Sequence, residues 1–176
     1  MPHETIPLPK RNNFEMIHVG DRIRVHWQSL GLVLPTGSTE TCITDFESRY
    51  AVSLPPDFRE YFLRVNGMDT HWPNSQDREG YSFWPLERVK SVPEEAVSHL
   101  HSDEWSGFSG AECLFVFADY LDWSWAYAIR LSSNALHGNP VFIIGKKKAP
   151  LEISDSFRGF VELYLIDSPI LYGRIA

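Results

Sequence analysis

The sequence predicts an α+β fold in which helices pack against a mostly antiparallel sheet. Three observations predict it: segments with helical periodicity come first, segments with strand-like alternation follow, and one amphipathic helix closes the chain. A length of 176 residues suits one domain, or one domain with a modest extension, and the 14% aromatic content supplies side chains for a core. No apolar run approaches the roughly eighteen residues that span a bilayer. The first residues lack the apolar stretch of a secretory signal.

We expect residues 1–37 to form an N-terminal extension to a domain of residues 38–176. The extension begins with three prolines in its first nine residues, which predict an extended arm. From Gly20 onward, apolar residues recur at helical spacing, namely Ile23, Trp27 and Leu30. Apolar residues also alternate in this stretch, so both a helix and a strand remain open.

A pair of helices is predicted next. Ser38 or Thr39 can cap the first helix, and its apolar face is formed by Ile43, Phe46 and Tyr50. The break at residues 54–57 contains two prolines, which a helix tolerates in its first turn but not in its interior. The second helix ends at Asn66-Gly67, because glycine accepts left-handed backbone. Its apolar face comprises Phe58, Tyr61, Phe62 and Val65.

The middle of the chain predicts short elements. Residues 68–80 are polar and contain proline and glycine, so they are expected to form a loop. Residues 81–84 are strand-like and end at Pro85. Residues 86–91 are expected to form a short helix, and residues 93–101 another with two glutamates in its first turn.

Three strands and a helix complete the expected fold. Residues 113–118 are typical of a buried strand, residues 125–131 alternate as a half-buried strand does, and residues 140–144 form a third strand. Ser154 is expected to cap the last helix. The apolar face of that helix comprises Phe157, Phe160, Val161 and Tyr164. This order predicts a sheet that helices cover on one face.

The net charge of −7 is concentrated in one segment. Residues 91–129 contain no Lys or Arg, and their carboxylates equal the whole net charge: Glu94, Glu95, Asp103, Glu104, Glu112, Asp119 and Asp122. Such a segment repels phosphate backbones and attracts basic proteins, so it disfavours nucleic-acid binding. A solvated face that only aids solubility is the simpler interpretation.

Residue chemistry gives little support to a metal site, a nucleophile or a cofactor. His99 and His101, beside two carboxylates, form the best potential ligand cluster. Positions i and i+2 of a helix point apart, so we expect no metal ion there. Cys42 and Cys113 are too few for a disulfide framework, and both are expected to be packed. No glycine-rich phosphate cradle precedes a helix, and we expect no cofactor.

Two acids and two tryptophans could still form a site. Asp119 and Asp122, three residues apart beyond a strand, could serve acid–base chemistry, which leaves a small hydrolase open. Trp105 and Trp123 lie beside acidic residues in loop-like sequence and are candidate interface residues. Three other tryptophans lie on periodic elements and are expected in the core: Trp27, Trp84 and Trp125.

A set of short motifs lies between residues 38 and 166. They are Ile43-x-x-Phe46-Glu47, Leu54-Pro55 with Asp57-Phe58-Arg59, Asn66-Gly67, Phe83-Trp84-Pro85-Leu86, the strand of residues 125–131, Pro140-Val141, and Ser156-Phe157 with Phe160. Together they resemble the SUKH superfamily, which includes the fungal Smi and Knr cell-wall-assembly regulators. The most specific part is the block from Leu-Pro to Asn-Gly. The sequence departs from the family pattern at Ala51 and Met68, where glycine is common, and at residues 122–124, which replace a glycine-containing turn.

The resemblance implies an α+β fold, no catalysis and structural roles for the motif residues. Leu54-Pro55 would set the angle between two helices, Asn66-Gly67 would end a helix, and Phe157 would pack on the sheet. Bacterial proteins of this kind look like immunity proteins, which neutralise a polymorphic toxin that is often a nuclease. The resemblance carries no recognition residues by name.

We therefore expect a cytoplasmic binding protein without catalytic, metal or cofactor sites. Its expected partner is a toxin with a basic surface, rather than nucleic acid or a membrane. The candidate partner-binding residues are Asp103, Glu104, Trp105, Glu112, Asp119, Asp122 and Trp123. A regulatory scaffold like the fungal proteins, and a hydrolase that uses Asp119 and Asp122, remain alternatives.

Overall fold

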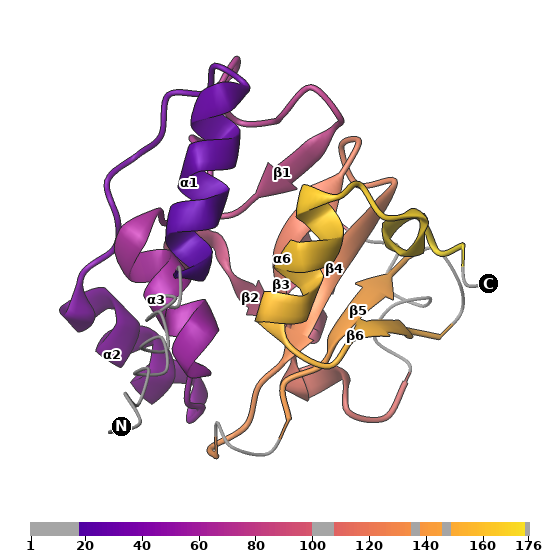
Figure 1. Cartoon of the computed structure of the whole chain (residues 1–176). Helices are drawn as coiled ribbons and strands as arrows, with labels where there is room; N and C mark the ends of the chain where they lie inside the picture. The colour runs from indigo at the N-terminus through magenta and orange to yellow at the C-terminus, as the bar shows by residue number, and fades with distance from the viewer. Residues whose placement is uncertain (1–17, 100–107, 135–137, 146–148, 175–176) are drawn as a thin grey trace, which may run out of the picture.

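The structure is a computed structural model that describes residues 18–99, 108–134, 138–145 and 149–174, with only the backbone of residues 97–99. Within these ranges, five α-helices and a six-stranded antiparallel sheet confirm the predicted α+β class. Figure 1 shows α1, α2 and α3 at the left of the view and α6 in front of the sheet, and α6 contacts α1 and α3. The helices are α1 (Val19–Ser29), α2 (Glu40–Tyr50), α3 (Pro56–Arg64), α4 (Val92–His99) and α6 (Phe157–Leu165).

The sheet has the strand order β1-β3-β4-β5-β6, and β2 also pairs with β3. The strands are β1 (Tyr81–Phe83), β2 (Lys90–Ser91), β3 (Leu114–Tyr120), β4 (Trp125–Arg130), β5 (Val141–Ile144) and β6 (Leu151–Ser154). β1 and β2 pair with successive parts of β3, so the long central strand organises this side of the sheet. β3 and β4 form a hairpin in which Tyr120 pairs with Trp125.

The ambiguous segment after Gly20 is the helix α1. Its buried side chains, among them Ile23 and Trp27, belong to the main hydrophobic cluster. The indole Nε1 of Trp27 donates to the hydroxyl of Tyr164 on α6 at 2.8 Å. Although α1 lies in the part of the chain expected to be an extension, it packs against α3 and α6 as an integral layer of the fold.

Three local expectations are corrected. Ser156, not Ser154, caps α6, because its Oγ accepts from the backbone N of Gly159 at 3.2 Å. Ser154 instead ends β6, an edge strand that is not predicted from the sequence. The segment of residues 86–91 is one 3-10 turn, η1 (Leu86–Arg88), followed by β2, because the residues after the turn pair with β3.

Both faces of the sheet are covered, which corrects the expectation of a single covered face. The inner residues of β4 are buried on both sides, although the sequence predicts a half-buried strand. The main cluster joins the helices to the sheet through, among others, Phe58, Phe62, Phe117, Tyr127, Phe157 and Phe160. The second cluster lies on the opposite face and comprises Trp84, Val92, Ala111, Leu114, Val116, Ala126, Ala128, Phe142 and Ile144.

The motif residues lie where helices meet loops. The carboxylate of Glu47 accepts from the backbone N of Leu54 at 2.8 Å, which fixes the turn between α2 and α3. The side-chain oxygen of Asn66 accepts from the backbone N of Leu86 at 2.9 Å. A Cβ at Gly67 would lie 2.5 Å from the backbone of Trp84 and Pro85, so only glycine fits. Among the described helices, none combines the length and apolar character needed to cross a bilayer.

Candidate protein-binding surface

The candidate partner-binding residues do not gather in one place. Asp103, Glu104 and Trp105 lie outside the described residues. Glu112 lies in the 3-10 turn η2 (Ala111–Cys113) before β3, whereas Asp119 and Asp122 lie at the far end of that strand. A strand of seven residues separates the two ends by roughly 20 Å. Glu112 therefore lies apart from the other described candidates, and Asp119, Asp122 and Trp123 lie together at the β3–β4 hairpin.

Asp119 lies inside this hairpin rather than on its surface. It is only 3% exposed. One carboxylate oxygen accepts from Trp84 Nε1 at 2.8 Å, and the other accepts from the backbone N of Trp123 at 3.3 Å. Burial raises the pKa of Asp119 above its ordinary value, and the two hydrogen bonds oppose that rise. We therefore place Asp119 among the residues that support the hairpin and leave it out of the contact surface.

The turn that Asp119 supports has an unusual backbone. Leu121, Asp122 and Trp123 have φ angles of 45°, 47° and 71°, so three successive non-glycine residues are left-handed. Each such residue costs about 1–2 kcal/mol, and surrounding contacts must offset that cost. Here the backbone N of Leu121 donates to the carbonyl of Gly80 at 2.8 Å, on the neighbouring loop. The turn thereby presents Leu121, which is 51% exposed, and the exposed Asp122 outward.

Aromatic rings flank the turn on one side. Tyr120 stacks on Trp125 with ring centroids 4.3 Å apart, and Tyr172 lies edge-on to Tyr120 at 5.5 Å. All three are partly exposed, so Trp125 does not lie fully in the core as the sequence predicts. We call residues 120–125 together with Tyr172 the hairpin tip. Tyr and Trp are enriched in protein interfaces, because they supply large contact areas with little loss of conformational entropy.

On the other side of the turn, Trp123 packs against the buried Trp84 at 4.9 Å. The guanidinium of Arg88 lies 4.1 Å from the centre of the Trp84 ring. A small pocket of about 160 Å³ opens here, lined by residues that include Asp69, Ser75, Arg88 and Asp122. This side of the turn is therefore polar, and its carboxylates outnumber its one guanidinium.

One exposed tryptophan is not among the residues that the sequence marks as interface candidates. Trp72 is 86% exposed, more than any other large hydrophobic side chain in the described part of the chain. It lies in the predicted loop of residues 68–80, and the polar residues around it are the only feature of the sequence that indicates its exposure. Asp77 holds this loop, because its carboxylate accepts from the backbone N of Tyr81 at 2.9 Å and from the Tyr164 hydroxyl at 2.5 Å.

The described residues contain no group of three or more His, Cys, Asp or Glu side chains that could hold an ion. The side chain of His99 and all of His101 lie outside the described residues. Cys42 and Cys113 are free thiols, and both are partly buried.

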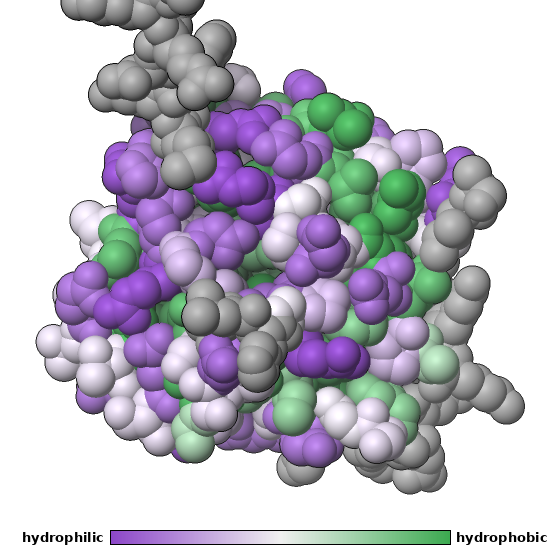
Figure 2. Space-filling view, turned by 60° about the horizontal axis from the view of Figure 1, so that its bottom comes forward, coloured by the Kyte–Doolittle hydropathy of each residue, from purple (hydrophilic) through white to green (hydrophobic). Residues whose placement is uncertain are grey.

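One face of the molecule is mostly polar. Figure 2 shows one face of the molecule, on which hydrophilic and intermediate residues predominate and hydrophobic residues are confined to smaller patches. A partner that docks on such a surface must be recognised through a few apolar contacts among many polar ones.

Comparison with known proteins identifies a family that the sequence matches. Residues 37–163 match the model of the SMI1 / KNR4 family (SUKH-1). No curated protein matches the sequence. The matched region contains α2, α3, the entire sheet and most of α6, whereas α1 and Tyr172 of the hairpin tip lie outside it.

Proposed function

Because the chain belongs to the SMI1 / KNR4 family (SUKH-1), we propose that it is a non-catalytic binding protein that neutralises a protein toxin by direct contact. The observation that carries the proposal is the hairpin tip. Its outward residues are aromatic, aliphatic or acidic, and a strained turn holds them in place. The partner face that complements it is basic and partly apolar.

Two properties of the tip support a basic partner. A Lys or Arg can contact the partly exposed rings of Tyr120 or Trp125, since aromatic rings attract cations. The carboxylate of Asp122 can pair with the same cation or its neighbour, and Asp122 is exposed. Arg88, which lines the pocket beside Asp122, is already held over the Trp84 ring. Toxins that act on nucleic acids carry basic clefts, and the exposed carboxylates of Glu112 and Asp122 would speed encounter with them.

The proposal includes a cytoplasmic location and no enzymatic activity. A hydrolase that uses Asp119 and Asp122 receives no support, because both Asp119 oxygens accept hydrogen bonds inside the hairpin. A scaffold for a signalling partner would use similar chemistry, and the genetic experiment below separates it from an immunity protein.

The test begins with gene neighbourhood and ends with protection. An immunity protein is expected to be encoded beside its toxin, so the gene immediately upstream should encode a toxin. Expression of that toxin alone should arrest growth, and co-expression of this chain should restore growth. The matched control is a chain with Leu121→Asp and Trp125→Ala in the hairpin tip, which should fold but protect poorly. A toxic upstream product that this chain fails to neutralise contradicts the proposal.

A further inference from the structure

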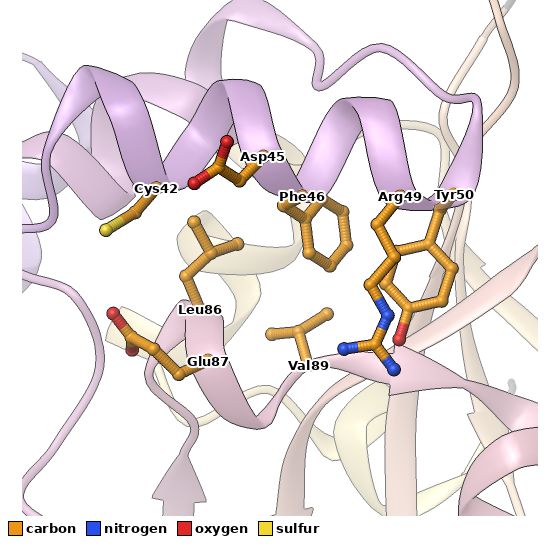
Figure 3. Close-up of a pocket in the computed structure, with 8 residues that line it drawn as sticks. All are labelled: Cys42, Asp45, Phe46, Arg49, Tyr50, Leu86, Glu87 and Val89. Carbon is orange, nitrogen blue, oxygen red and sulfur yellow. The ribbon is translucent and has the colours of Figure 1, made fainter.

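A groove runs between α2 and residues 86–89, which comprise η1 and the residue before β2. Figure 3 shows α2 on one side of the groove and Leu86, Glu87 and Val89 on the other. The cavity has a volume of about 310 Å³, at the lower end of the range for ligand pockets.

The floor of the groove is apolar and packed into the core. Phe46 of α2 points toward Leu86 and Val89 in Figure 3, and these three side chains are buried members of the main core. Phe46 is also held by Phe115 of β3, whose ring centroid lies 5.8 Å away. The floor is therefore preformed, and an apolar side chain placed there would lose contact with water without rearranging the groove.

One end of the groove is closed by a hydrogen-bonded cluster. Glu94 of α4 accepts from Tyr50 Oη and from Arg49 Nη2, both at 2.6 Å. Burial, which is the larger cause, and the hydrogen bond to Glu94 raise the pKa of Tyr50 to about 12. The guanidinium of Arg49 is thus already paired and is not available as a free cation at the opening.

The remaining charges at the opening are acidic. Asp45 is exposed and makes no hydrogen bond or ion pair with the part of the chain that the structure describes. Glu87 is also exposed, and its one described contact is the amide of Asn66 at 3.3 Å. Three carboxylates therefore surround an apolar floor, and one paired guanidinium is the only opposing charge among the described lining residues and Glu94.

We infer that this groove binds a segment of the partner in which one large apolar side chain is flanked by Lys or Arg. The apolar side chain fills the space between Phe46 and Val89, and a flanking cation pairs with Asp45 or Glu87. This inference rests on the proposed function, because it assigns a second contact to the same basic partner. An acidic or uncharged segment would meet the same floor but would bring repulsion, or no attraction, at the opening.

The experiment uses the full chain and a defined probe, so it needs no toxin. A blocked pentapeptide with a central leucine between two lysines is titrated into the isotope-labelled protein, and backbone amide shifts are followed by NMR. The shifts should be confined to α2 and residues 86–89. A peptide with glutamates in place of the lysines, and one with alanine in place of leucine, should bind at least about fivefold more weakly, as expected for the loss of an ion pair or an apolar contact.

A matched pair of variants tests the charge requirement. Asp45→Lys replaces the carboxylate at the groove with a positive charge. The affinity for the lysine–leucine peptide should fall by about fivefold or more, since an attraction becomes a repulsion. Glu152→Lys makes the same change on the exposed edge strand β6 and should leave peptide affinity unaltered.

The outcomes separate the groove from the proposed function. Shifts outside α2 and residues 86–89, equal binding of the glutamate peptide, or an unaffected Asp45→Lys variant would each overturn the groove assignment. None of these results bears on whether the chain neutralises a toxin. Peptide binding as expected, together with failure of the protection experiment, would uphold the groove and reject the proposed partner.

Discussion

The hydroxyl of Tyr164 on α6 donates to the carboxylate of Asp77, in the loop before β1, at 2.5 Å. The same hydroxyl accepts from Trp27 Nε1 of α1 at 2.8 Å, so one oxygen joins three separate parts of the chain. Burial raises the pKa of Asp77, while its hydrogen bonds from Tyr164, Tyr81 and Glu79 oppose the rise. Trp27 and Tyr164 both lie outside residues 37–163, so this link attaches the flanking segments to the family fold.

Removal of this hydroxyl should destabilise the protein. In Tyr164→Phe, Trp27 Nε1 loses its acceptor and Asp77 loses a donor, so the free energy of unfolding should fall by about 1–3 kcal/mol. Urea denaturation measures the change. The control is Tyr120→Phe, a partly exposed tyrosine for which a change within about 0.5 kcal/mol is expected. Equal effects of the two substitutions would show that the buried link adds nothing to stability.

The central core should depend strongly on Phe157. This residue is fully buried, with its ring centroid 4.7 Å from that of Phe58 and 5.6 Å from that of Phe117. Phe157→Ala should lower the free energy of unfolding by about 3–5 kcal/mol, since it removes a buried aromatic ring and leaves a cavity. A loss below about 1 kcal/mol, outside the range for a buried ring, would contradict this packing.

Asp119 should make stability depend on pH in a defined direction. Its pKa is raised in the folded protein, mainly by burial, above the ordinary value of 3.8. The folded state therefore keeps the proton to higher pH than the unfolded chain does. The contribution of Asp119 to stability is complete below the unfolded pKa and is lost as pH rises through the folded pKa.

The substitution Asp119→Asn removes this titration while keeping an acceptor for Trp84. The free energy of unfolding of the variant, minus that of the parent, should increase as pH rises from about 4 to 7. Urea denaturation at a series of pH values measures it. Parallel pH profiles for variant and parent would mean that Asp119 does not titrate as its burial implies.

The helix pair follows from the sequence because its signals agree. The spacing of Phe58, Tyr61 and Phe62 favours one helical face, and proline and glycine mark the ends. For α1, the same apolar positions also satisfy an alternating pattern, so the sequence leaves two structures open. Only the packing of Trp27 against α3 and α6 decides between them.

Other features depend on tertiary contacts that the sequence does not display. Ala126 and Ala128 occupy the smaller positions of an alternating strand, and small residues suit either solvent or a covered face. Their burial in the second cluster comes from elements distant in the chain, such as Val92 and Ala111. The left-handed turn at Leu121–Trp123 contains no glycine that would predict it. It is held instead by the buried carboxylate of Asp119 and the carbonyl of Gly80.

The hairpin tip should govern the rate of association with a basic partner. Asp122→Lys reverses an exposed charge at the tip, so it should slow association and weaken its dependence on salt. Glu152→Lys changes the net charge equally on β6, at the opposite edge of the sheet from β1. If both variants associate with the toxin at the same rate at low salt, net charge rather than the tip controls encounter.

The most direct test of the account is to titrate the purified upstream-encoded toxin with this chain and to measure the remaining toxin activity and the stoichiometry together. We predict a complex of defined stoichiometry that abolishes toxin activity, and a marked loss of affinity for the Leu121→Asp, Trp125→Ala variant. An active toxin in the presence of excess folded chain, or inhibition that is the same for the parent and the hairpin-tip variant, would contradict the account.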